Sequence, residues 1–287
     1  MRPAVSVIVP VLNGAATLPG LLQSLERQTY GGAWEVVVAD NGSSDRSRDL
    51  LSGWSGRLPG LRWVDASGRR GVSHARNVGS RGARGRLLAF IDQDDEADPG
   101  WLGALVEAAG PGGFVAGRCD FRRLNHPIVR AWSPEPPRDR LPHAHLLPYA
   151  IGTNLAVDAD VLRRVGGWDE SLRHGGEDVE LSLRLQMAAH ALTFVPDAVV
   201  HKRRRQTLGG LARQQFLNGA ASVGVYRRFR SHLRPQAPWA SLRAWGHILL
   251  TSGDLLRSPE WRGHWVAIAA RRLGRLVGSV RERVFYI

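Results

Sequence analysis

A cluster of acidic side chains could carry out chemistry in this chain. Asp92, Asp94, Asp95 and Glu96 fall within five positions, directly after the expected strand Arg86–Ile91. Carboxylates this close repel one another, and their hard oxygen atoms suit Mg²⁺ or Mn²⁺. A divalent ion held there could bind a diphosphate by bridging its oxygens. The alternative is a solvated acidic loop that caps the next helix, which is the role that we expect for Glu96.

A second acidic pair opens a later helix. Glu177 and Asp178 follow two glycines, Gly175 and Gly176. One carboxylate could take the proton from an acceptor hydroxyl as a general base, and the flexible glycines would let the loop approach a substrate closely. The alternative is an N-terminal cap that interacts with the helix dipole.

A histidine is a third candidate. His201 ends the apolar segment Ala198–Val200 and precedes the basic run Lys202–Arg205. Its imidazole could complete a metal site, and the basic run could bind a diphosphate. A purely structural histidine at the end of a strand is the alternative.

Two further side chains could bind a nucleotide. Asp40 follows an expected strand, where its carboxylate could accept a hydrogen bond from a ring N–H of a base. Arg76 lies in an expected helix and could neutralise phosphate charge with its planar fork of donors. The alternatives are an Asx turn at Asp40 and an ordinary surface position for Arg76.

These residues must be positioned by the elements around them. Apolar strands are expected at Val5–Val9, Trp34–Ala39, Leu61–Val64 and Arg86–Ile91, and a helical pattern follows each of the first three. This alternation predicts an α/β fold with a mostly parallel sheet and helices on both faces. Ligands bind such sheets at the carboxyl ends of the strands, where Asp40 and Asp92 are expected to lie.

The chain changes character in two places. Residues 133–148 contain five prolines and predict a long loop that could form a lid or an acceptor-facing wall. From Leu208 onward, helical segments are dense in Arg and Trp, so we expect a catalytic domain at residues 1–207 and a helical extension at 208–287. The amphipathic segment Trp261–Val280 predicts a helix that packs on the catalytic domain or, alternatively, lies on an anionic membrane surface.

Composition limits the class of protein. Hydrophobic residues make up 43% and charged residues 23%, which is typical of a globular protein. Cys119 is the only cysteine, which excludes an internal disulfide and a zinc site built from several cysteines. We identify no signal peptide and no membrane-spanning stretch, and therefore expect a cytoplasmic protein, with peripheral contact at the inner face of the membrane as an extension of this expectation.

The formal charge of +13 would attract polyanions. Lys202 is the only lysine among 39 basic residues, so the excess of arginine can reflect genomic base composition as much as a binding need. No zinc-finger spacing and no aromatic RNA-binding motif is present, and we expect no nucleic-acid partner. The chain also lacks a P-loop, a Gly-x-Ser-x-Gly elbow and a Gly-x-Gly-x-x-Gly motif after the first strand, which weakens ATPase, hydrolase and dinucleotide-binding interpretations.

Several motifs, taken in order, resemble one known family. The chain is similar to family 2 glycosyltransferases of the A-type nucleotide-diphosphosugar transferase fold over roughly residues 4–205. The matching segments are VSVIVPVLNG, VVVADNGSSD, GVSHARNVG, LLAFIDQDD, GTNLAV, GGWDESLRHGGEDVELSLRLQ and FVPDAVVHKRRR.

The resemblance implies a role for each motif residue. Asp40 would bind the nucleobase in a pocket lined by Pro10 and Val11, while Arg76 and Asn77 would support the nucleotide. In the acidic motif, Asp92 would reach the ribose and contribute to the metal site, and Asp94 would coordinate Mn²⁺ or Mg²⁺ with Asp95 beside it. Asp178 would be the base and Glu177 its support, and His201 would match a metal or phosphate contact found in some members.

The resemblance also sets an expected reaction. It implies an inverting, metal-dependent transfer from a nucleoside-diphosphate sugar to an acceptor hydroxyl on a glycan, a lipid carrier or a small molecule. A UDP-sugar is the expected donor because Asp40 suits the N3–H of uracil, with thymidine, which offers the same donor, and guanosine, which has others, as the alternatives. The chain has Gly14 where many members carry an acidic residue, and it lacks the Gln-x-x-Arg-Trp motif of processive synthases, so a single transfer is expected. The alternatives are a nucleotidyltransferase of similar fold and a non-enzymatic membrane-surface or nucleic-acid-binding protein.

Overall fold

The chain folds into two compact units. The computed structural model describes residues 3–144, 147–172, 175–232 and 238–286. For residues 238–241 it describes the backbone alone. The first unit, here called the sheet unit, comprises Met1–Asp120, Pro136–Arg173 and Glu177–Lys202. The second, called the helical unit, comprises Phe121–Glu135, His174–Gly176 and Arg203–Ile287.

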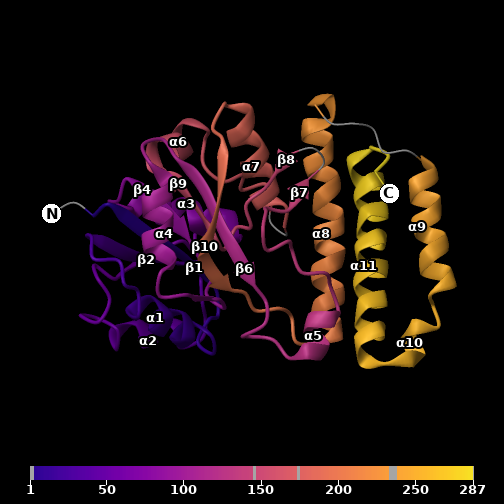
Figure 1. Cartoon of the computed structure of the whole chain (residues 1–287), viewed down its shortest axis with the longest axis horizontal. Coiled ribbons are helices and arrows are strands. Elements are labelled where there is room, and N and C mark those ends of the chain that lie inside the picture. Colours follow the sequence, from indigo (N-terminus) through magenta and orange to yellow (C-terminus); the bar gives the residue numbers. More distant parts are fainter. Residues whose placement is uncertain (1–2, 145–146, 173–174, 233–237, 287) are drawn as a thin grey trace. The chain divides into compact units, whose positions relative to one another are not determined.

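The sheet unit contains alternating strands and helices in its first half and a more irregular order in its second (Figure 1). Its strands are β1 (Val5–Val11), β2 (Trp34–Asp40), β3 (Arg62–Asp65), β4 (Leu87–Phe90), β5 (Glu96–Ala97), β6 (Phe114–Asp120), β7 (His143–Ala144), β8 (Leu147–Pro148), β9 (Leu155–Asp158) and β10 (Leu192–His201). Its helices are α1 (Leu18–Glu26), α2 (Ser47–Ser52), α3 (Val72–Gly82), α4 (Trp101–Ala109), α6 (Ala159–Arg164) and α7 (Glu177–Met187).

The main sheet is mixed, because it contains both parallel and antiparallel strand pairs. Its strand order is β3-β2-β1-β4-β9-β6-β10-β5. Strands β1 to β4 pair in parallel, and so do β6 and β10, whereas β9 runs antiparallel to both β4 and β6. The predicted α/β fold with a mostly parallel sheet is confirmed. The antiparallel strand β9 is an addition that our sequence analysis did not predict.

Both faces of the sheet are covered, as the unbroken apolar strands require. All seven residues of β1 are buried, and alternate side chains supply the two sides of the core. Val7 and Val9 pack with leucines of α1 and with α4, while Ile8 packs with α6 and α7. In the view of Figure 1, α1 lies below the sheet and α6 and α7 lie above it.

A buried asparagine links β9 to the elements around it. The side chain of Asn154 is fully buried and accepts a hydrogen bond from Trp101 Nε1 at 2.9 Å. Its amide donates to the backbone carbonyls of Arg118 and Ala198, each at 2.9 Å. Because every polar atom of this buried side chain is paired, Asn154 fixes the start of β9 against α4, β6 and β10. The preceding residues, Gly152 and Thr153, are thereby held at the edge of the sheet.

The helical unit is built on α5 (Pro127–Ala131), α8 (Leu208–Phe229), the 3₁₀ turn η1 (Arg230–His232), α9 (Pro238–Leu250), α10 (Asp254–Arg257) and α11 (Pro259–Glu282). Helices α8 and α11 pack along much of their length. A Cβ at Gly274 would collide with the carbonyl of Phe216, so glycine is needed for this close approach. In the parts of the chain that the structure describes, no helix combines the length and apolar run needed to cross a bilayer.

The predicted loop at residues 133–148 and the predicted domain boundary after residue 207 remain to be compared with the structure. The described part of the predicted loop at residues 133–148 contains the short antiparallel pair β7–β8, while residues 145–146 lie outside the described chain. Its role as a lid or an acceptor-facing wall remains a prediction, as does our division of the chain into domains at residues 1–207 and 208–287.

Candidate functional site

The acidic cluster lies in the loop between β4 and β5. Asp92, Asp94 and Asp95 each offer a carboxylate oxygen, and these oxygens lie within 4.8 Å of one another. Within the described ranges this is the group of carboxylates and histidines that meets the spacing of a metal site. Three hard oxygen donors suit Mg²⁺ or Mn²⁺, so the donor set fits the cofactor that the sequence predicts.

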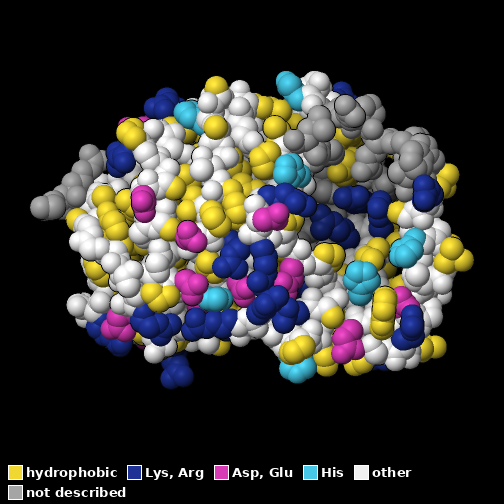
Figure 2. Space-filling view, viewed as in Figure 1, with side chains coloured by type: hydrophobic (Ala, Val, Ile, Leu, Met, Phe, Trp, Pro, Cys, Tyr) yellow, Lys and Arg dark blue, Asp and Glu magenta, His cyan; other side chains and the backbone are white. Residues whose placement is uncertain are grey.

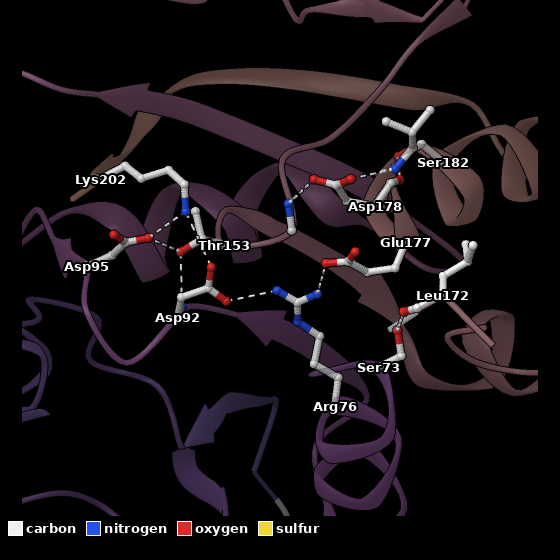
Figure 3. Close-up of polar contacts among 12 residues, drawn as sticks. Ser73, Arg76, Asp92, Asp95, Thr153, Leu172, Glu177, Asp178, Ser182 and Lys202 are labelled. Atoms are coloured by element: carbon white, nitrogen blue, oxygen red, sulfur yellow. Dashed lines mark hydrogen bonds and ion pairs between the residues drawn. The ribbon is translucent and has the colours of Figure 1, made fainter. Parts of the chain in front are cut away.

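Two neighbours organise this cluster. Thr153 Oγ1 donates to Asp95 Oδ2 at 2.6 Å and accepts a hydrogen bond from the backbone N–H of Asp92 at 2.9 Å. Lys202 Nζ lies 3.1 Å from Asp95 Oδ2 and 3.3 Å from Asp92 Oδ2 (Figure 3). Burial raises the pKa of Asp95 to about 6, even though the charge of Lys202 opposes this effect. Burial alone would lower the pKa of Lys202, but the charges of Asp95 and Asp92 outweigh it and raise that pKa above its ordinary value.

Arg76 joins the acidic cluster to the second acidic pair. Its guanidinium donates to Asp92 Oδ1 at 2.8 Å and to Glu177 Oε1 at 3.1 Å, and it lies 4.5 Å from the centre of the Trp168 ring. Figure 3 shows the side chain of Arg76 directed between the two carboxylates. Arg76 is only 2% exposed, so this is a buried ion pair on each side. The surface alternative for Arg76 is wrong, because this side chain lies on the buried face of α3, where Asp92 and Glu177 neutralise its charge.

These contacts set the charge of the carboxylates. Burial alone would raise the pKa of Asp92, but the charges of Lys202 and Arg76 hold it below its ordinary value. Burial and the charge of Asp178 raise the pKa of Glu177, and Arg76 opposes them only in part. The two carboxylates that Arg76 joins therefore differ in their affinity for a proton.

The acidic pair stands at the start of α7, next to the Gly152–Thr153 segment. The backbone N–H of Gly152 donates to Asp178 Oδ2 at 3.2 Å. A Cβ at Gly152 would lie 2.9 Å from the guanidinium of Arg76, so the absence of a side chain lets the segment pass between these groups. Glu177 Oε2 is buried and has no hydrogen-bond partner among the described residues. Burying a carboxylate oxygen without a hydrogen-bond donor costs free energy of folding. Glu177 Oε2 is therefore a candidate contact for a substrate hydroxyl.

The predicted base pocket lies at the ends of β1 and β2. Pro10 pairs with Ala39 and Val11 with Asp40, so the three predicted residues are neighbours across the parallel strands. Asp40 Oδ1 accepts hydrogen bonds from the backbone N–H of Ser43 at 2.9 Å and from its hydroxyl at 2.5 Å. An Asx turn would use the N–H of Gly42, two residues on, so the carboxylate instead holds the loop one residue further along. The role of Asp40 in binding a base remains a prediction, as do those of Pro10 and Val11.

The side chain of Gln93 connects this pocket to the acidic cluster. Its Oε1 accepts a hydrogen bond from the backbone N–H of Leu12 at 2.8 Å, and its Nε2 donates to the carbonyl of Leu12 at 3.1 Å. The loops that follow β1 and β4 are thereby tied together at one edge of the sheet. A Cβ at Gly14 would lie 2.8 Å from Gln93 Oε1, so a side chain at this position would crowd Gln93. Gly14 is also the position at which this chain departs from the pattern of the family that it resembles.

Two predicted site residues have other partners. Asn77 donates to the carbonyl of Trp168 and to Glu170 Oε1, each at 2.9 Å, and accepts from the backbone N–H of Trp168 at 2.8 Å. Asn77 thus holds the turn that carries Trp168 beneath Arg76. Its predicted contact with the nucleotide remains a prediction.

His201 is the other. Its Nε2 lies 2.9 Å from Asp98 Oδ1 and its Nδ1 lies 3.6 Å from Asp120 Oδ1. Within the described chain, the carboxylate group that meets metal-site spacing does not include His201. Metal ligation by His201 remains a prediction.

Several residues of the site were missed in the sequence. Thr153 and Gly152 belong to the GTNLAV motif, but nothing in that motif marks them as contacts of an acidic cluster. Lys202 was grouped with a basic run, whereas Arg204 of the same run lies in the helical unit and donates to the carbonyls of Arg130 and Ser133. Trp168 belongs to the GGWDESLRHGGEDVELSLRLQ segment, but nothing there marks it as a neighbour of Arg76. The position of Lys202, directly after the predicted metal ligand His201, could have indicated that it lies near the acidic cluster.

Comparison with known proteins adds independent information. Residues 6–166 match the family described as Glycosyl transferase family 2, and residues 141–265 match the one described as Glycosyl transferase family group 2. Glycosyltransferase AglE of Haloferax volcanii is 30% identical over 96% of this chain and 88% of its own length. Validoxylamine A glucosyltransferase of Streptomyces hygroscopicus is 35% identical over 66% of this chain, which spans only 52% of that relative.

A solved structure resembles the whole fold. The mannosyltransferase PcManGT from Pyrobaculum calidifontis, in complex with GDP-Man and Mn²⁺, superposes with a TM-score of 0.63. The match covers 96% of this chain and 88% of that one, at 22% identity. Identity at this level supports the likeness of the folds and nothing finer.

Substitution of Arg76 should expose its structural role. Arg76→Met leaves Asp92 and Glu177 without their shared cation, and we expect a loss of about 3–5 kcal/mol in the free energy of unfolding. Arg76→Lys keeps the charge but not the fork, so its loss should be smaller. The measurement is urea unfolding followed by circular dichroism, with Arg81→Met, an exposed position on α3, as the control. Equal stability of Arg76→Met and the control would contradict the buried double ion pair.

Proposed function

Since the chain belongs to glycosyl transferase family 2 and is therefore a glycosyltransferase, we propose that it moves one sugar from a nucleoside-diphosphate sugar to an acceptor hydroxyl with inversion at the anomeric carbon. The observation that carries this proposal is the pair of carboxylate groups on either side of Arg76. One group has the donor set of a cation site, and the other is placed to receive a proton. With the family known, the nucleotidyltransferase and scaffold alternatives are dropped.

The two carboxylate groups divide the work of the transfer. We assign Asp94 as the main metal ligand, with Asp92 and Asp95 beside it. A divalent cation held there would supply electrostatic stabilisation to the departing diphosphate. The presence of GDP-Man and Mn²⁺ in PcManGT supports, by analogy of fold alone, a divalent cation and a nucleoside-diphosphate sugar as ligands. Pro10, Val11 and Asp40 would hold the base at the neighbouring strand ends.

Asp178 acts as the general base in this proposal. The acceptor oxygen forms a bond to the anomeric carbon while the bond from that carbon to the diphosphate oxygen breaks. The proton of the acceptor hydroxyl moves to the Asp178 carboxylate, which the backbone N–H of Gly152 holds in place. Glu177, fixed by Arg76, orients the acceptor through its unpaired Oε2. Attack from the face opposite the leaving group gives inversion.

The helical unit supports a second element of the proposal, which is contact with an anionic lipid surface. Leu242, Leu249, Leu250 and Leu256 of α9 and α10 are 73–89% exposed. Figure 2 shows hydrophobic side chains at the surface of α9 and α10 with basic and histidine side chains among them. Exposed leucines next to basic groups suit the interface of an anionic membrane, and the formal charge of +13 has the matching sign.

Nucleotide and metal should stabilise the protein together. We expect Mn²⁺ with one class of nucleotide, UDP, GDP or dTDP, to raise the melting temperature by roughly 5 °C at saturating concentration, because the complex binds only the folded state. EDTA should abolish most of the shift, and so should Asp94→Asn. Asp139→Asn, an exposed carboxylate of the same unit, is the control. A shift of equal size in EDTA would refute metal-dependent donor binding.

Asp178→Asn should separate binding from chemistry. With a donor and acceptor pair that the wild-type enzyme turns over, we expect kcat to fall by about 10²–10⁴-fold while the KM for the donor stays nearly constant. Release of the nucleoside diphosphate is the readout, and Asp197→Asn, which is exposed on β10, is the control. If donor affinity fell in parallel with kcat, Asp178 would be reassigned to donor binding.

If α9 and α10 contact a lipid surface, substitution of their exposed leucines should weaken binding to vesicles. Replacing both Leu249 and Leu250 by Glu should weaken sedimentation with vesicles of phosphatidylcholine and phosphatidylglycerol by at least about tenfold, because it replaces apolar with anionic surface. Vesicles of phosphatidylcholine alone should bind the wild-type protein weakly. Met187→Glu, an exposed apolar position in the sheet unit, serves as the control. Unchanged sedimentation of the double variant would remove this element.

A further inference from the structure

Lys202 occupies the space among the carboxylates that a cation site needs. Its Nζ lies 3.1 Å from Asp95 Oδ2 and 3.3 Å from Asp92 Oδ2, and Asp94 adds to the charge that it feels. It is the only lysine of the chain, where every other basic position except histidine is arginine. Figure 3 shows its side chain directed at Asp92 and Asp95, two of the three carboxylates from which the metal site would be built.

The fold holds Lys202 at this place. Strand β10 pairs with β5 through Val200 and Ala97 and through His201 and Glu96, which brings the end of β10 beside the acidic loop. The backbone N–H of Lys202 donates to the carbonyl of Asp120 at 2.8 Å, so the residue continues the line of β6 and β10. The side chain is 24% exposed, whereas that of Asp95 is fully buried. The ammonium therefore approaches a buried carboxylate from a position that retains access to solvent.

The carboxylate oxygens are already engaged. Asp92 Oδ1 accepts from Arg76 and its Oδ2 from Lys202, and Asp95 Oδ2 accepts from both Lys202 and Thr153. A divalent cation bound to these oxygens would lie within a few ångströms of the ammonium. Two like charges that close repel strongly in a partly desolvated site, so metal and ammonium compete for one position.

We propose that Lys202 is a built-in counter-ion of the acidic cluster, and that it makes the binding of metal and of the donor diphosphate depend on each other. Without the diphosphate, the ammonium neutralises the cluster and keeps metal affinity low. When the diphosphate arrives, the ammonium leaves the carboxylates to bind phosphate oxygen, and the cation takes its place. This inference rests on the proposed function of the site and adds an order to the binding of its two ligands.

Charge balance and side-chain chemistry agree with this arrangement. Three carboxylates form the cluster, and because Arg76 is shared between Asp92 and Glu177, Lys202 supplies the positive charge that a divalent metal would otherwise supply. Binding free energies are reciprocal, so a diphosphate that strengthens metal binding is itself bound more strongly when metal is present. A lysine suits this exchange because its compact charge sits on a flexible stem, whereas an arginine fork is held in a fixed geometry.

The first test measures metal alone. Titration of Mn²⁺ followed by the electron paramagnetic resonance signal of the free ion gives its Kd without nucleotide. We expect Lys202→Met to bind Mn²⁺ at least tenfold more tightly than the wild-type protein, and Lys202→Arg to remain close to wild type. Arg163→Met, which removes the same charge from a side chain that is 75% exposed, is the control for net charge. UDP or GDP should raise Mn²⁺ affinity less in Lys202→Met than in the wild-type protein.

The second test needs no substitution, so it decides the matter even if Lys202→Met does not fold. Since Lys202 is the only lysine, the rate of its acylation by an amine-reactive reagent can be followed by mass spectrometry, with the terminal α-amine as reference. We expect Mn²⁺ alone to raise the labelling rate several-fold over the concentration range in which Mn²⁺ binds. Binding of Mn²⁺ with no change in labelling would mean that metal and ammonium coexist, and would overturn the proposal.

The outcomes distinguish this inference from the proposed function. Equal Mn²⁺ affinity in the wild-type protein and in Lys202→Met would overturn the role of Lys202 while leaving a metal site in place. If no form bound Mn²⁺, with or without nucleotide, the metal site of the proposed function would fail and this inference would fail with it.

Discussion

Arg76 and Lys202 pair with three carboxylates in one partly buried region of the sheet edge. Asp92 pairs with both cations, Asp95 pairs with Lys202, and Glu177 pairs with Arg76. Without these partners the carboxylates would repel one another or take up protons, because charge is costly to bury without compensation. The spacing of the site therefore depends on charge neutralisation inside the protein. The raised pKa values of Asp95 and Glu177 indicate that this neutralisation is incomplete.

In the proposed function, this incomplete neutralisation serves the binding of a cation. A cluster with residual negative charge attracts a cation. The same residues thus face two demands, since they must be stable when empty and reactive when the donor is bound. Internal cations that can exchange for a metal or a phosphate meet both demands.

The sheet supplies the geometry for these charges. Parallel strands β1, β2 and β4 end at one edge and bring the residues proposed to hold the base next to the acidic loop. The antiparallel strand β9 then enters between β4 and β6, and Asn154 fixes its start by three side-chain and two backbone hydrogen bonds. This places Thr153 against Asp95 and Gly152 against Arg76. The reversed strand β9 therefore connects the acidic loop after β4 to the acidic pair of α7.

The sequence by itself determined the α/β class, the strands before Asp40 and Asp92, and the carboxylates that could bind metal or accept a proton. These features are local, because apolar periodicity and acidic residues after a strand can be read within a few positions. Only the tertiary structure decided that Arg76 is buried between two acidic groups, that β9 runs antiparallel, and that Lys202 enters the acidic cluster. Those contacts join residues 16 to 110 positions apart in the chain, and their partners are selected by strand order and packing rather than by neighbouring sequence.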